Sequence, residues 1–425
     1  MTIIVCPTEK CNFRCTACFE PESERIHSET PYSFEAIQGG LNEIWSGPYQ
    51  GSDVCLHGGE PTLIPTHEFE KLLSLIYNLP WKKQDGTMGI KGSVSIVTNG
   101  STVTDQMIEL FKKYNVYVGI SKDGPTELNV YRGPDPTDGK VTQEYNEKLW
   151  ETIKKLRRHN IPVNIMCILH KKNAGTVEQL KTMYRWLLSL KKIGIKGGRL
   201  NPMYSNAHPE VELTTDELYR AWNFFYRINK RHDLNWNPLQ EMTKNLKGEK
   251  RASASHFTPG PCSFNRCDLF NTHTISVLPD GRIGNCDRTF AHGTYQRSRE
   301  RGKSGRYEAL KQTECKGCRY WPVCGGGCPE EGRDGDWRNK TRFCEAIKRI
   351  YGYIEDKLVE DDPLVSLVVG QPEEYEPIGN VPHGDAAHGD SAHGDAGHGD
   401  AMHGDAPHGD LPHGDSSHGD SPDWV

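Results

Sequence analysis

The stretch Cys11-Asn12-Phe13-Arg14-Cys15-Thr16-Ala17-Cys18 decides how the rest of this 425-residue chain is interpreted. It places three cysteines on one short loop, directly after the apolar run Ile3-Ile4-Val5. Structural zinc takes four protein ligands, so three closely spaced thiolates without a nearby fourth are incomplete for zinc. A [4Fe–4S] cluster bound by three thiolates leaves one iron open to a ligand that is not protein. Three structural or reduced cysteines are the alternative interpretation.

Length and composition bound the class of protein. A chain of 425 residues can bury a large core and suggests two or three domains. No apolar stretch is long enough to cross a bilayer, and no secretory signal precedes Cys6. A disulfide-rich secreted protein would be far shorter for fourteen cysteines. We therefore expect a soluble protein of a reducing cytoplasm, with thiolates kept for iron and sulfide and with no membrane partner.

The net charge of −6 is unevenly distributed. Residues 371–425 contain nine Asp, three Glu and no Lys or Arg, a charge of −12, which leaves +6 on residues 1–370. No basic run is interleaved with aromatic residues, so nucleic-acid binding is not indicated. A mildly basic body would tolerate an anionic peptide as a partner.

Residues 1–235 alternate short β-rich runs with longer amphipathic stretches, which is typical of a parallel sheet covered by helices. Strands are predicted at Thr2–Cys6, Asp53–His57, Ser93–Thr98, Val116–Ser121, Val163–Leu169 and Ile195–Leu200. Helices are predicted at 34–46, 66–78, 104–113, 144–159, 175–190 and 214–231, with later ones at 240–246 and 342–358.

The three-cysteine loop after a first strand resembles the signature of the radical S-adenosylmethionine (radical SAM) enzymes. In that family the open iron is chelated by the amino and carboxylate groups of SAM. The resemblance implies an α/β fold, a partial (β/α)6 barrel of the TIM type, and the six predicted β/α units fit it. In such barrels the chemistry lies at the carboxyl ends of the strands, and the motifs described next follow predicted strands.

The motif His57-Gly58-Gly59-Glu60-Pro61-Thr62 follows the second predicted strand. Glycines there let the backbone approach a ligand closely, and a carboxylate can accept hydrogen bonds from an ammonium group. A plain turn is the alternative. The placement matches the GGE motif of the radical SAM family, so the resemblance implies that Gly58, Gly59 and Glu60 hold the amino group of SAM.

Further cofactor-binding residues are expected at the ends of later strands. By resemblance to the peptide-modifying branch of the family, Ser121 and Arg132 bind the ribose or carboxylate of SAM, while Asp123 fits the same motif or caps a turn. Asn-Gly and Asp-Gly-Pro also form plain turns, so that alternative stays open. The residues assigned to SAM beyond the glycine motif are Asn99, Ser121, Arg132 and Leu200, the last flanking the adenine.

One position departs from the family pattern. An aromatic residue usually precedes the third cysteine and packs near the adenine, but this chain has Ala17 there. We expect Phe13 or Phe19 to cover the base instead.

The remaining metal-type cysteines lie between residues 262 and 344, and their spacing resembles the SPASM domain, an extension that carries auxiliary iron–sulfur clusters. Eight thiolates suffice for two [4Fe–4S] clusters with four ligands each. A double zinc ribbon is the alternative, because C-x2-C pairs also bind zinc. Following the fully ligated family members, the first auxiliary cluster is assigned Cys262, Cys267, Cys286 and Cys328, and the second Cys315, Cys318, Cys324 and Cys344. The other cysteines, Cys6, Cys55 and Cys167, are expected in the core.

Asp287 directly follows Cys286. The anaerobic sulfatase-maturating enzymes, which this layout resembles, have a carboxylate at that place that serves as the base when the substrate radical is oxidised. By this resemblance Asp287 is the candidate catalytic residue. The alternative is a carboxylate that only hydrogen-bonds backbone near a cluster.

The C-terminal tail repeats His-Gly-Asp eight times at five-residue spacing from His383. It has no bulky core residues, so we expect it to be disordered. It can be an inert solubilising tail, or a metal-capturing tail built from imidazoles and carboxylates. It can also be a peptide substrate fused to its own enzyme, since effective concentration would replace affinity. The chain starts almost at its first strand, which leaves little room for a leader-binding domain and favours the last hypothesis over metal capture.

Together these features predict a radical SAM oxidoreductase that abstracts hydrogen from a peptide residue and oxidises or crosslinks it, as a ribosomal-peptide maturase. A formylglycine-forming sulfatase maturase is the first alternative, and a metal-handling protein that is not an enzyme is the second. The expected cofactors are SAM and three [4Fe–4S] clusters, with flavodoxin or ferredoxin as the electron donor. The expected domains are the barrel at 1–235, the SPASM domain at 236–365 and the acidic linker with its repeat tail at 366–425.

Overall fold

The structure is a computed structural model that describes residues 2–16, 18, 30–46, 53–79, 93–205, 208–249, 274–284, 286 and 305–370. The chain divides into two compact units, Met1–Tyr375 and Glu376–Val425, and all of the described residues belong to the first. Several predictions fall outside the described residues. These are the predictions for Ala17, Phe19, Cys262, Cys267, Asp287 and the repeat tail.

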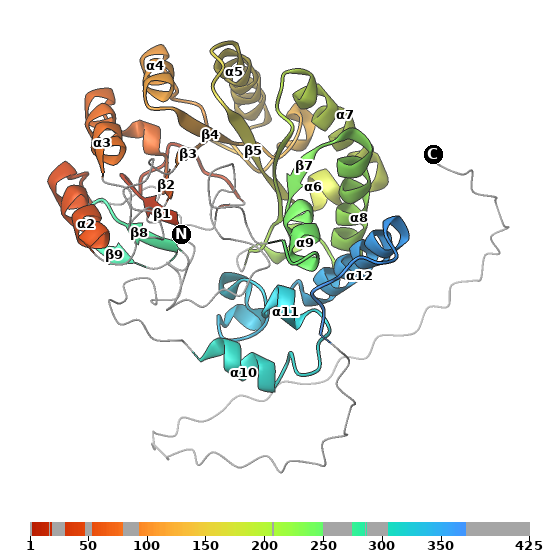
Figure 1. Ribbon diagram of the computed structural model, residues 1–425. Coiled ribbons are helices and arrows are strands. Elements are labelled where there is room, and N and C mark those ends of the chain that lie inside the picture. Colours follow the sequence, from red (N-terminus) through yellow and green to blue (C-terminus); the bar gives the residue numbers. More distant parts are fainter. Residues whose placement is uncertain are drawn as a thin grey trace, which may run out of the picture. The chain divides into compact units, whose positions relative to one another are not determined.

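A curved sheet forms the centre of this unit (Figure 1). Its strand order is β7-β6-β5-β4-β3-β2-β1-β8-β9, and neighbours pair in parallel except for the antiparallel pair β8–β9. The strands are β1 (Thr2–Val5), β2 (Asp53–Leu56), β3 (Val94–Thr98), β4 (Val116–Ser121), β5 (Val163–Leu169), β6 (Gly197–Pro202), β7 (Asn235–Asn237), β8 (Thr274–Val277) and β9 (Ile283–Gly284).

A helix follows each of the first six strands, and these helices lie along the outer side of the sheet (Figure 1). They are α2 (Phe34–Ser46), α3 (Thr66–Asn78), α4 (Asp105–Lys113), α5 (Gly139–Arg158), α7 (Val177–Lys192) and α8 (Thr215–His232), with the short α6 (Lys171–Ala174) before α7. The predicted fold class, a partial (β/α)6 barrel, is confirmed.

Side-chain caps determine where several helices begin. Thr214 caps α8 by accepting from the Glu217 amide, and the Glu217 side chain bonds back to Thr214. The helix α5 starts at Gly139, five residues before the predicted position 144, because the Asp138 carboxylate accepts from the Lys140 and Val141 amides.

The strands β7, β8 and β9 were not predicted from the sequence. They are short, and their pairing depends on edges supplied by distant segments: β8 pairs with β1, and β7 pairs with β6. The strand β6 runs from Gly197 to Pro202, two residues later than predicted, because its register with β5 pairs Leu169 with Pro202. The predicted domain boundary at residue 235 stays a prediction, although β8 extends the sheet of the barrel.

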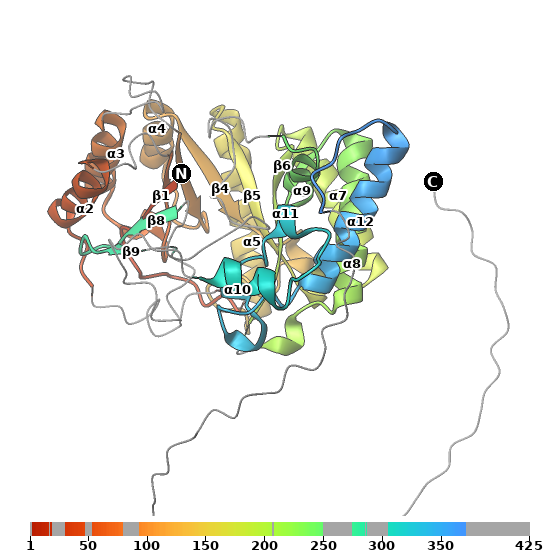
Figure 2. The same ribbon diagram turned by 60° about the horizontal axis from the view of Figure 1, so that its bottom comes forward.

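Several helices follow the barrel strands (Figure 2). The helix α12 (Cys344–Asp361) packs against α8, and α9 (Leu239–Leu246) contacts β7 and α12. The remaining helices are α10 (Arg306–Gln312) and α11 (Trp321–Cys324), with the 3-10 turns η1 (Pro61–Leu63), η2 (Thr126–Leu128), η3 (Pro209–Val211), η5 (Pro329–Glu331) and η6 (Arg333–Gly335).

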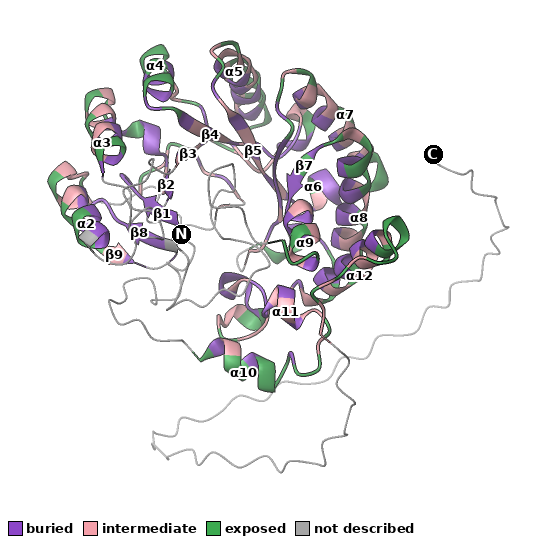
Figure 3. Ribbon diagram, in the orientation of Figure 1, coloured by how far each residue is buried: buried purple, intermediate pink, exposed green. Residues whose placement is uncertain are grey.

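Burial differs between the two faces of the sheet (Figure 3). Alternate residues of β4 and β5 are fully buried under the helices, and the residues between them are only partly buried. The partly buried face includes Ser121 and Ile168 and faces the interior of the barrel. Within the described residues, no helix is both long and apolar enough to span a membrane.

We predict that Trp222→Ala lowers the free energy of unfolding by about 3–5 kcal/mol, because it removes a large core side chain. Trp222 is fully buried on α8, and its indole Nε1 donates to the Leu200 carbonyl at 3.3 Å. Urea unfolding measures the change. Val177→Ala on α7, where the side chain is 49% exposed, is the control and should change stability by less than about 0.5 kcal/mol. Equal effects would contradict the assigned packing.

Candidate cofactor site at the carboxyl ends of the strands

The loop of Cys11, Cys15 and Cys18 follows β1 at the carboxyl end of the sheet. Cys15 is buried, whereas Cys11 and Cys18 are partly exposed, and the Cys18 amide donates to the Cys15 carbonyl at 3.2 Å. Nowhere in the described ranges do three His, Cys, Asp or Glu side chains lie close enough to hold a single metal ion. A cube of four irons is larger than one ion, so its ligands lie farther apart. Three thiols on one loop, two of them partly accessible, fit such a cluster with one free iron.

The glycine motif supports this loop from the β2 side. The Gly59 amide donates to the Thr8 carbonyl at 3.0 Å, and the Glu60 amide donates to the Lys10 carbonyl at 2.8 Å. A Cβ on Gly59 would lie 2.2 Å from the Lys10 carbonyl oxygen. Gly58 has a φ of +123°, and a Cβ there would lie 2.3 Å from the Cys6 Sγ. Gly58 and Gly59 therefore allow the chain that leads into the cysteine loop to lie against β2.

The Glu60 carboxylate joins the end of β2 to the end of β3. Its Oε1 accepts from the Thr62 amide (3.1 Å), the Thr62 hydroxyl (2.6 Å) and the Thr98 hydroxyl (2.7 Å), and its Oε2 accepts from the Asn99 amide (2.7 Å). Burial raises the pKa of Glu60, and these hydrogen bonds oppose the shift. The sequence analysis predicted that Glu60 binds the amino group of SAM. These contacts show that Glu60 also holds the ends of β2 and β3 together.

Residues 131–133 hold the cysteine loop from the opposite side. The Arg14 amide donates to the Gly133 carbonyl at 3.0 Å, and the Thr16 amide donates to the Tyr131 carbonyl at 2.9 Å. Arg132 lies between these two acceptors, so the backbone that positions Arg132 is also the backbone that positions Cys15. Burial alone would lower the pKa of Arg132, but the Asp123 carboxylate and Cys15 raise it, so the guanidinium stays charged.

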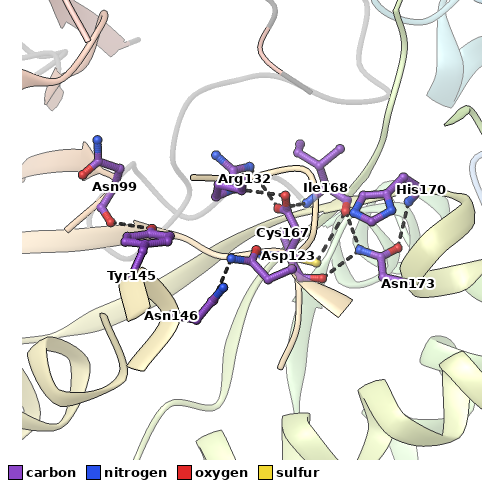
Figure 4. A network of polar contacts seen from close by, with 10 residues as sticks. Asn99, Asp123, Arg132, Tyr145, Asn146, Cys167, Ile168, His170 and Asn173 are labelled. Carbon is purple, nitrogen blue, oxygen red and sulfur yellow. Dashed lines mark hydrogen bonds and ion pairs between the residues drawn. The ribbon is translucent and has the colours of Figure 1, made fainter. Parts of the chain in front are cut away.

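Asp123 fixes the Arg132 side chain through two hydrogen bonds (Figure 4). The Arg132 Nε donates to Asp123 Oδ2 at 3.0 Å, and Nη2 donates to Oδ1 at 2.9 Å. Asp123 Oδ1 also accepts from the Ile168 amide at 2.9 Å, which ties the end of β4 to β5. Such a bidentate pair restricts the guanidinium to one orientation. Asp123, left between two interpretations by the sequence, holds Arg132.

Asparagine side chains surround this ion pair. The sequence analysis did not predict a role for them, because an asparagine alone carries no recognisable motif. Asn173 Nδ2 donates to the carbonyls of Asp123 (2.7 Å) and Ile168 (2.8 Å), while Asn129 Oδ1 accepts from the Asp123 amide (2.7 Å). Asn129 Nδ2 donates in turn to Asn146 Oδ1 at 2.8 Å. Because buried amides can both donate and accept, these residues pair the backbone groups that the strand ends expose.

Two titratable groups lie beside this network. Lys122 is buried and donates to Asn146 Oδ1 at 2.6 Å, and burial lowers its pKa to about 8. Burial also lowers the pKa of His170 to about 4, which leaves its imidazole neutral at pH 7. The His170 Nδ1 accepts from the Lys172 amide at 3.2 Å and so caps the short helix α6. Neither residue was singled out in the sequence.

Asn99, a predicted cofactor-binding residue, contacts the cysteine loop directly. Its Nδ2 donates to Asn12 Oδ1 at 2.9 Å and approaches the Cys11 Sγ at 4.0 Å. Its Oδ1 accepts from the amide and hydroxyl of Ser101, and Ser101 accepts from Asn12. Asn99 therefore orients Cys11.

The other predicted contacts are placed as follows. Phe13 is buried edge-to-face on Tyr145, with ring centroids 4.6 Å apart, so it packs under the loop. Tyr145 donates to the Asn99 carbonyl at 2.8 Å (Figure 4). The Leu200 side chain is buried in the core, and its carbonyl accepts from Trp222.

The structure brings together the thiols assigned to the second auxiliary cluster. Burial raises the pKa of Cys315 to about 11 and that of Cys324 to about 12, and in both cases neighbouring cysteines, Cys344 and Cys318 among them, add to the shift. Charges influence one another in this way only at short range. Of the first set, Cys286 is buried and Cys328 is half-buried.

Residues 5–183, which contain the cysteine loop, the glycine motif and Arg132, match the family model described as the Radical SAM superfamily. The chain carries a radical SAM domain. This match and the enzymes named as its relatives identify the protein as an enzyme, which confirms the prediction and sets aside the alternative of a metal-handling protein without activity.

Curated relatives extend the similarity beyond the radical SAM domain. The cysteine-type anaerobic sulfatase-maturating enzyme of Clostridium novyi is 24% identical over 364 residues, covering 81% of this chain and 92% of that protein. The serine-type anaerobic sulfatase-maturating enzyme of Klebsiella aerogenes is 24% identical over 356 residues, covering 75% of this chain and 77% of that protein. The chain is thus homologous to this group of enzymes over most of its length.

Solved structures show the same fold. The structure of native anSMEcpe with bound AdoMet and Cp18Cys peptide has a TM-score of 0.63 and 19% identity, covering 85% of this chain and 98% of that chain. Streptococcus suis SuiB has a TM-score of 0.53 and 13% identity, covering 80% of this chain and 76% of that chain. The fold of the radical SAM domain is therefore shared with both.

We predict that Gly59→Ala reduces the iron bound per chain after anaerobic reconstitution, because the new Cβ would collide with the Glu9 and Lys10 carbonyls. Visible absorbance and iron analysis measure the loss. Gly39→Ala on α2 is the matched control, since nothing lies within 4 Å of a Cβ there, and it should bind iron normally. Normal iron content in Gly59→Ala would contradict the close approach of the two segments.

We predict that Asp123→Asn lowers the free energy of unfolding by about 3–5 kcal/mol and weakens SAM binding, because it leaves the Arg132 charge buried without its partner. Denaturant unfolding and equilibrium dialysis with SAM measure the two effects. Asp105→Asn, which breaks the exposed ion pair with Lys155, is the control and should cost less than about 1 kcal/mol. If the two variants behave alike, Asp123 does not hold Arg132.

Proposed function

We propose that this enzyme modifies a peptide or protein substrate by radical chemistry, as an oxidoreductase that matures a ribosomally made peptide. The observation that carries the proposal is the three-cysteine loop, held between the β2 glycines and the Arg132 segment at the carboxyl ends of the strands. The anSMEcpe structure, which holds AdoMet and the Cp18Cys peptide, supports a peptide substrate.

The proposed cofactors are SAM and three [4Fe–4S] clusters, one on the N-terminal loop and two auxiliary. When bound, the N-terminal cluster and SAM supply the 5′-deoxyadenosyl radical that abstracts hydrogen from an unactivated carbon. The cluster ligands proposed for this task are Cys11, Cys15 and Cys18. A flavodoxin or ferredoxin is the proposed electron donor.

The chain's own residues bind and orient SAM. Arg132, kept charged and oriented by Asp123, offers its guanidinium to the carboxylate or ribose of SAM together with Ser121. Glu60 Oε2 accepts one hydrogen bond within the protein, so it retains a lone pair for the amino group of SAM. The buried network around Asp123 sets these groups before the ligand arrives, which reduces the cost of ordering them.

The outcome proposed for the substrate is oxidation or crosslinking. The auxiliary clusters, held by the cysteines from 262 to 344, would accept the surplus electron, and Asp287 would accept the proton. Formylglycine formation on a sulfatase is the second candidate, favoured by curated relatives named as sulfatase-maturating enzymes that match most of the chain.

The His-Gly-Asp repeats from His383 are a candidate substrate tethered to the enzyme. Eight copies with fixed His-Gly-Asp and variable spacers resemble a multi-copy precursor peptide. A tethered substrate would be present at millimolar effective concentration, so little affinity is needed. Metal capture and an inert solubilising tail remain the other hypotheses for this segment.

The experiment that tests the function is turnover of the anaerobically reconstituted full chain with SAM and dithionite. We expect 5′-deoxyadenosine to form in wild type and in Cys55→Ala, whose thiol lies in the β2 core, and not in Cys15→Ala. Tandem mass spectrometry should then show that peptides from the repeats have lost mass through the removal of hydrogen atoms. Without 5′-deoxyadenosine from the loaded wild type, the proposed activity is wrong. With 5′-deoxyadenosine but an unmodified tail, the substrate lies elsewhere, and a sulfatase peptide is tested next.

A further inference from the structure

The register of the sheet aligns four residues in one row across the barrel. Ser121 of β4 pairs with Met166 of β5, Met166 pairs with Arg199 of β6, and Arg199 pairs with Asn237 of β7. Paired residues of parallel strands point to the same face. The neighbour of Ser121, Lys122, reaches α5 on the outer side, so the row containing Ser121 faces the interior of the barrel.

The β6–β7 end of this row is polar and buried. Arg199 and Glu241 of α9 form an ion pair, with Arg199 Nη2 3.4 Å from Glu241 Oε1 and side chains only 2% and 7% exposed. Asn237 is 6% exposed. Asn201 lies two residues beyond Arg199 on the same face of β6, toward the carboxyl end. We refer to Arg199, Asn201, Asn237 and Glu241 as the polar wall.

Three acceptor atoms of the polar wall have no hydrogen-bond partner. They are Asn201 Oδ1, Asn237 Oδ1 and Glu241 Oε2, all buried and unpaired within the described part of the chain. A buried acceptor without a donor costs about 1–3 kcal/mol, so such groups are rare in folded proteins. Three of them at one end of the sheet indicate that their donors come from outside the described residues.

The polar wall borders the residues assigned to SAM but shares no side chain with them. Leu200, expected to flank the adenine, lies between Arg199 and Asn201, and its side chain is buried in the core on the opposite face of β6. The cysteine loop is held by segments that follow β2 and β4, and Arg132 belongs to the second of these segments. Arg199 lies two strands from Ser121, a distance of about 10 Å at the usual strand spacing. A ligand at the polar wall would therefore lie beside SAM and not on it.

We propose that the polar wall is a binding subsite for the backbone of the peptide substrate. Amide N–H groups of a peptide would donate to the three unpaired oxygens, and Arg199 would donate to a peptide carbonyl or carboxylate. This inference rests on the proposed function, because it assumes a peptide substrate and names the residues that bind it. The subsite sets which carbon of the peptide faces SAM.

The test compares Asn237→Leu with wild type in the full chain, since leucine has the same branched outline as asparagine, at a larger volume, and removes the unpaired amide oxygen. The melting temperature of a chain shortened to residues 1–375, which lacks the candidate substrate, should rise, because a buried acceptor oxygen without a donor is removed. Modification of the repeat tail should fall by about tenfold per mole of 5′-deoxyadenosine, as expected for one lost hydrogen bond to the substrate. Affinity for SAM should not change.

Two further variants make the result specific. Glu241→Gln keeps the outline of the polar wall and removes the negative charge that pairs with Arg199. It should lower stability and also uncouple modification from 5′-deoxyadenosine formation. Asn164→Leu, on the interior face of β5 but outside the polar wall, is the matched control and should leave coupling unchanged.

The possible outcomes separate the hypotheses. A lower melting temperature in Asn237→Leu would mean that ordered water or the protein satisfies this amide, and the subsite would be wrong. Weaker SAM binding would assign the polar wall to the cofactor and overturn the inference. If wild type forms no 5′-deoxyadenosine, the proposed function itself fails. If wild type forms it but leaves the tail unmodified, the tail is not the substrate, and the melting temperature decides on the subsite.

Discussion

The structure depends on the backbone hydrogen bonds that fix the cysteine loop from two sides. On one side the amides of Gly59 and Glu60 donate to the carbonyls that precede Cys11, and on the other the carbonyls of Tyr131 and Gly133 accept from the loop. A loop that carries reactive thiols has little regular structure of its own, so neighbouring strand ends must pair its polar groups. Because these bonds use backbone atoms, they fix the conformation of the loop but place little restriction on which residue types occupy it. The glycines are the exception, since no Cβ fits there.

The second constraint is the buried polar network at the ends of β4 and β5 (Figure 4). Asp123 bonds to Arg132 and to the Ile168 amide, and Asn173 bonds to both carbonyls beside it. In a low-dielectric environment a fully paired network of this kind is rigid, and a partly paired one is costly. The network thus holds one positive charge at a fixed place beside Cys15. This arrangement suits a ligand that brings its own carboxylate, because the protein need not reorganise to bind it.

The two edges of the barrel differ in their polar chemistry. The β1–β4 edge pairs its side chains within the protein and around the cysteine loop, as the closed contacts of Glu60 and Asn99 show. The β6–β7 edge leaves buried acceptors unpaired on Asn201, Asn237 and Glu241. Paired groups stabilise the fold and unpaired buried acceptors destabilise it, and in the proposed peptide subsite the substrate supplies the missing donors. Cofactor and substrate would then occupy neighbouring parts of one sheet.

The sequence by itself determined the class of fold and the chemistry of the loop. Alternating apolar runs and amphipathic stretches located six strands and six helices, because burial on both faces of a parallel sheet leaves a strong local pattern. Cysteine spacing is likewise a local property, so Cys11, Cys15 and Cys18 were found without a structure. The tertiary structure decided what lies between them. It showed that Asp123 pairs with Arg132 and that Glu60 links the ends of β2 and β3. It also added β7 and β8 to the sheet. These features depend on contacts between residues far apart in the chain, and no periodicity or local motif records such contacts.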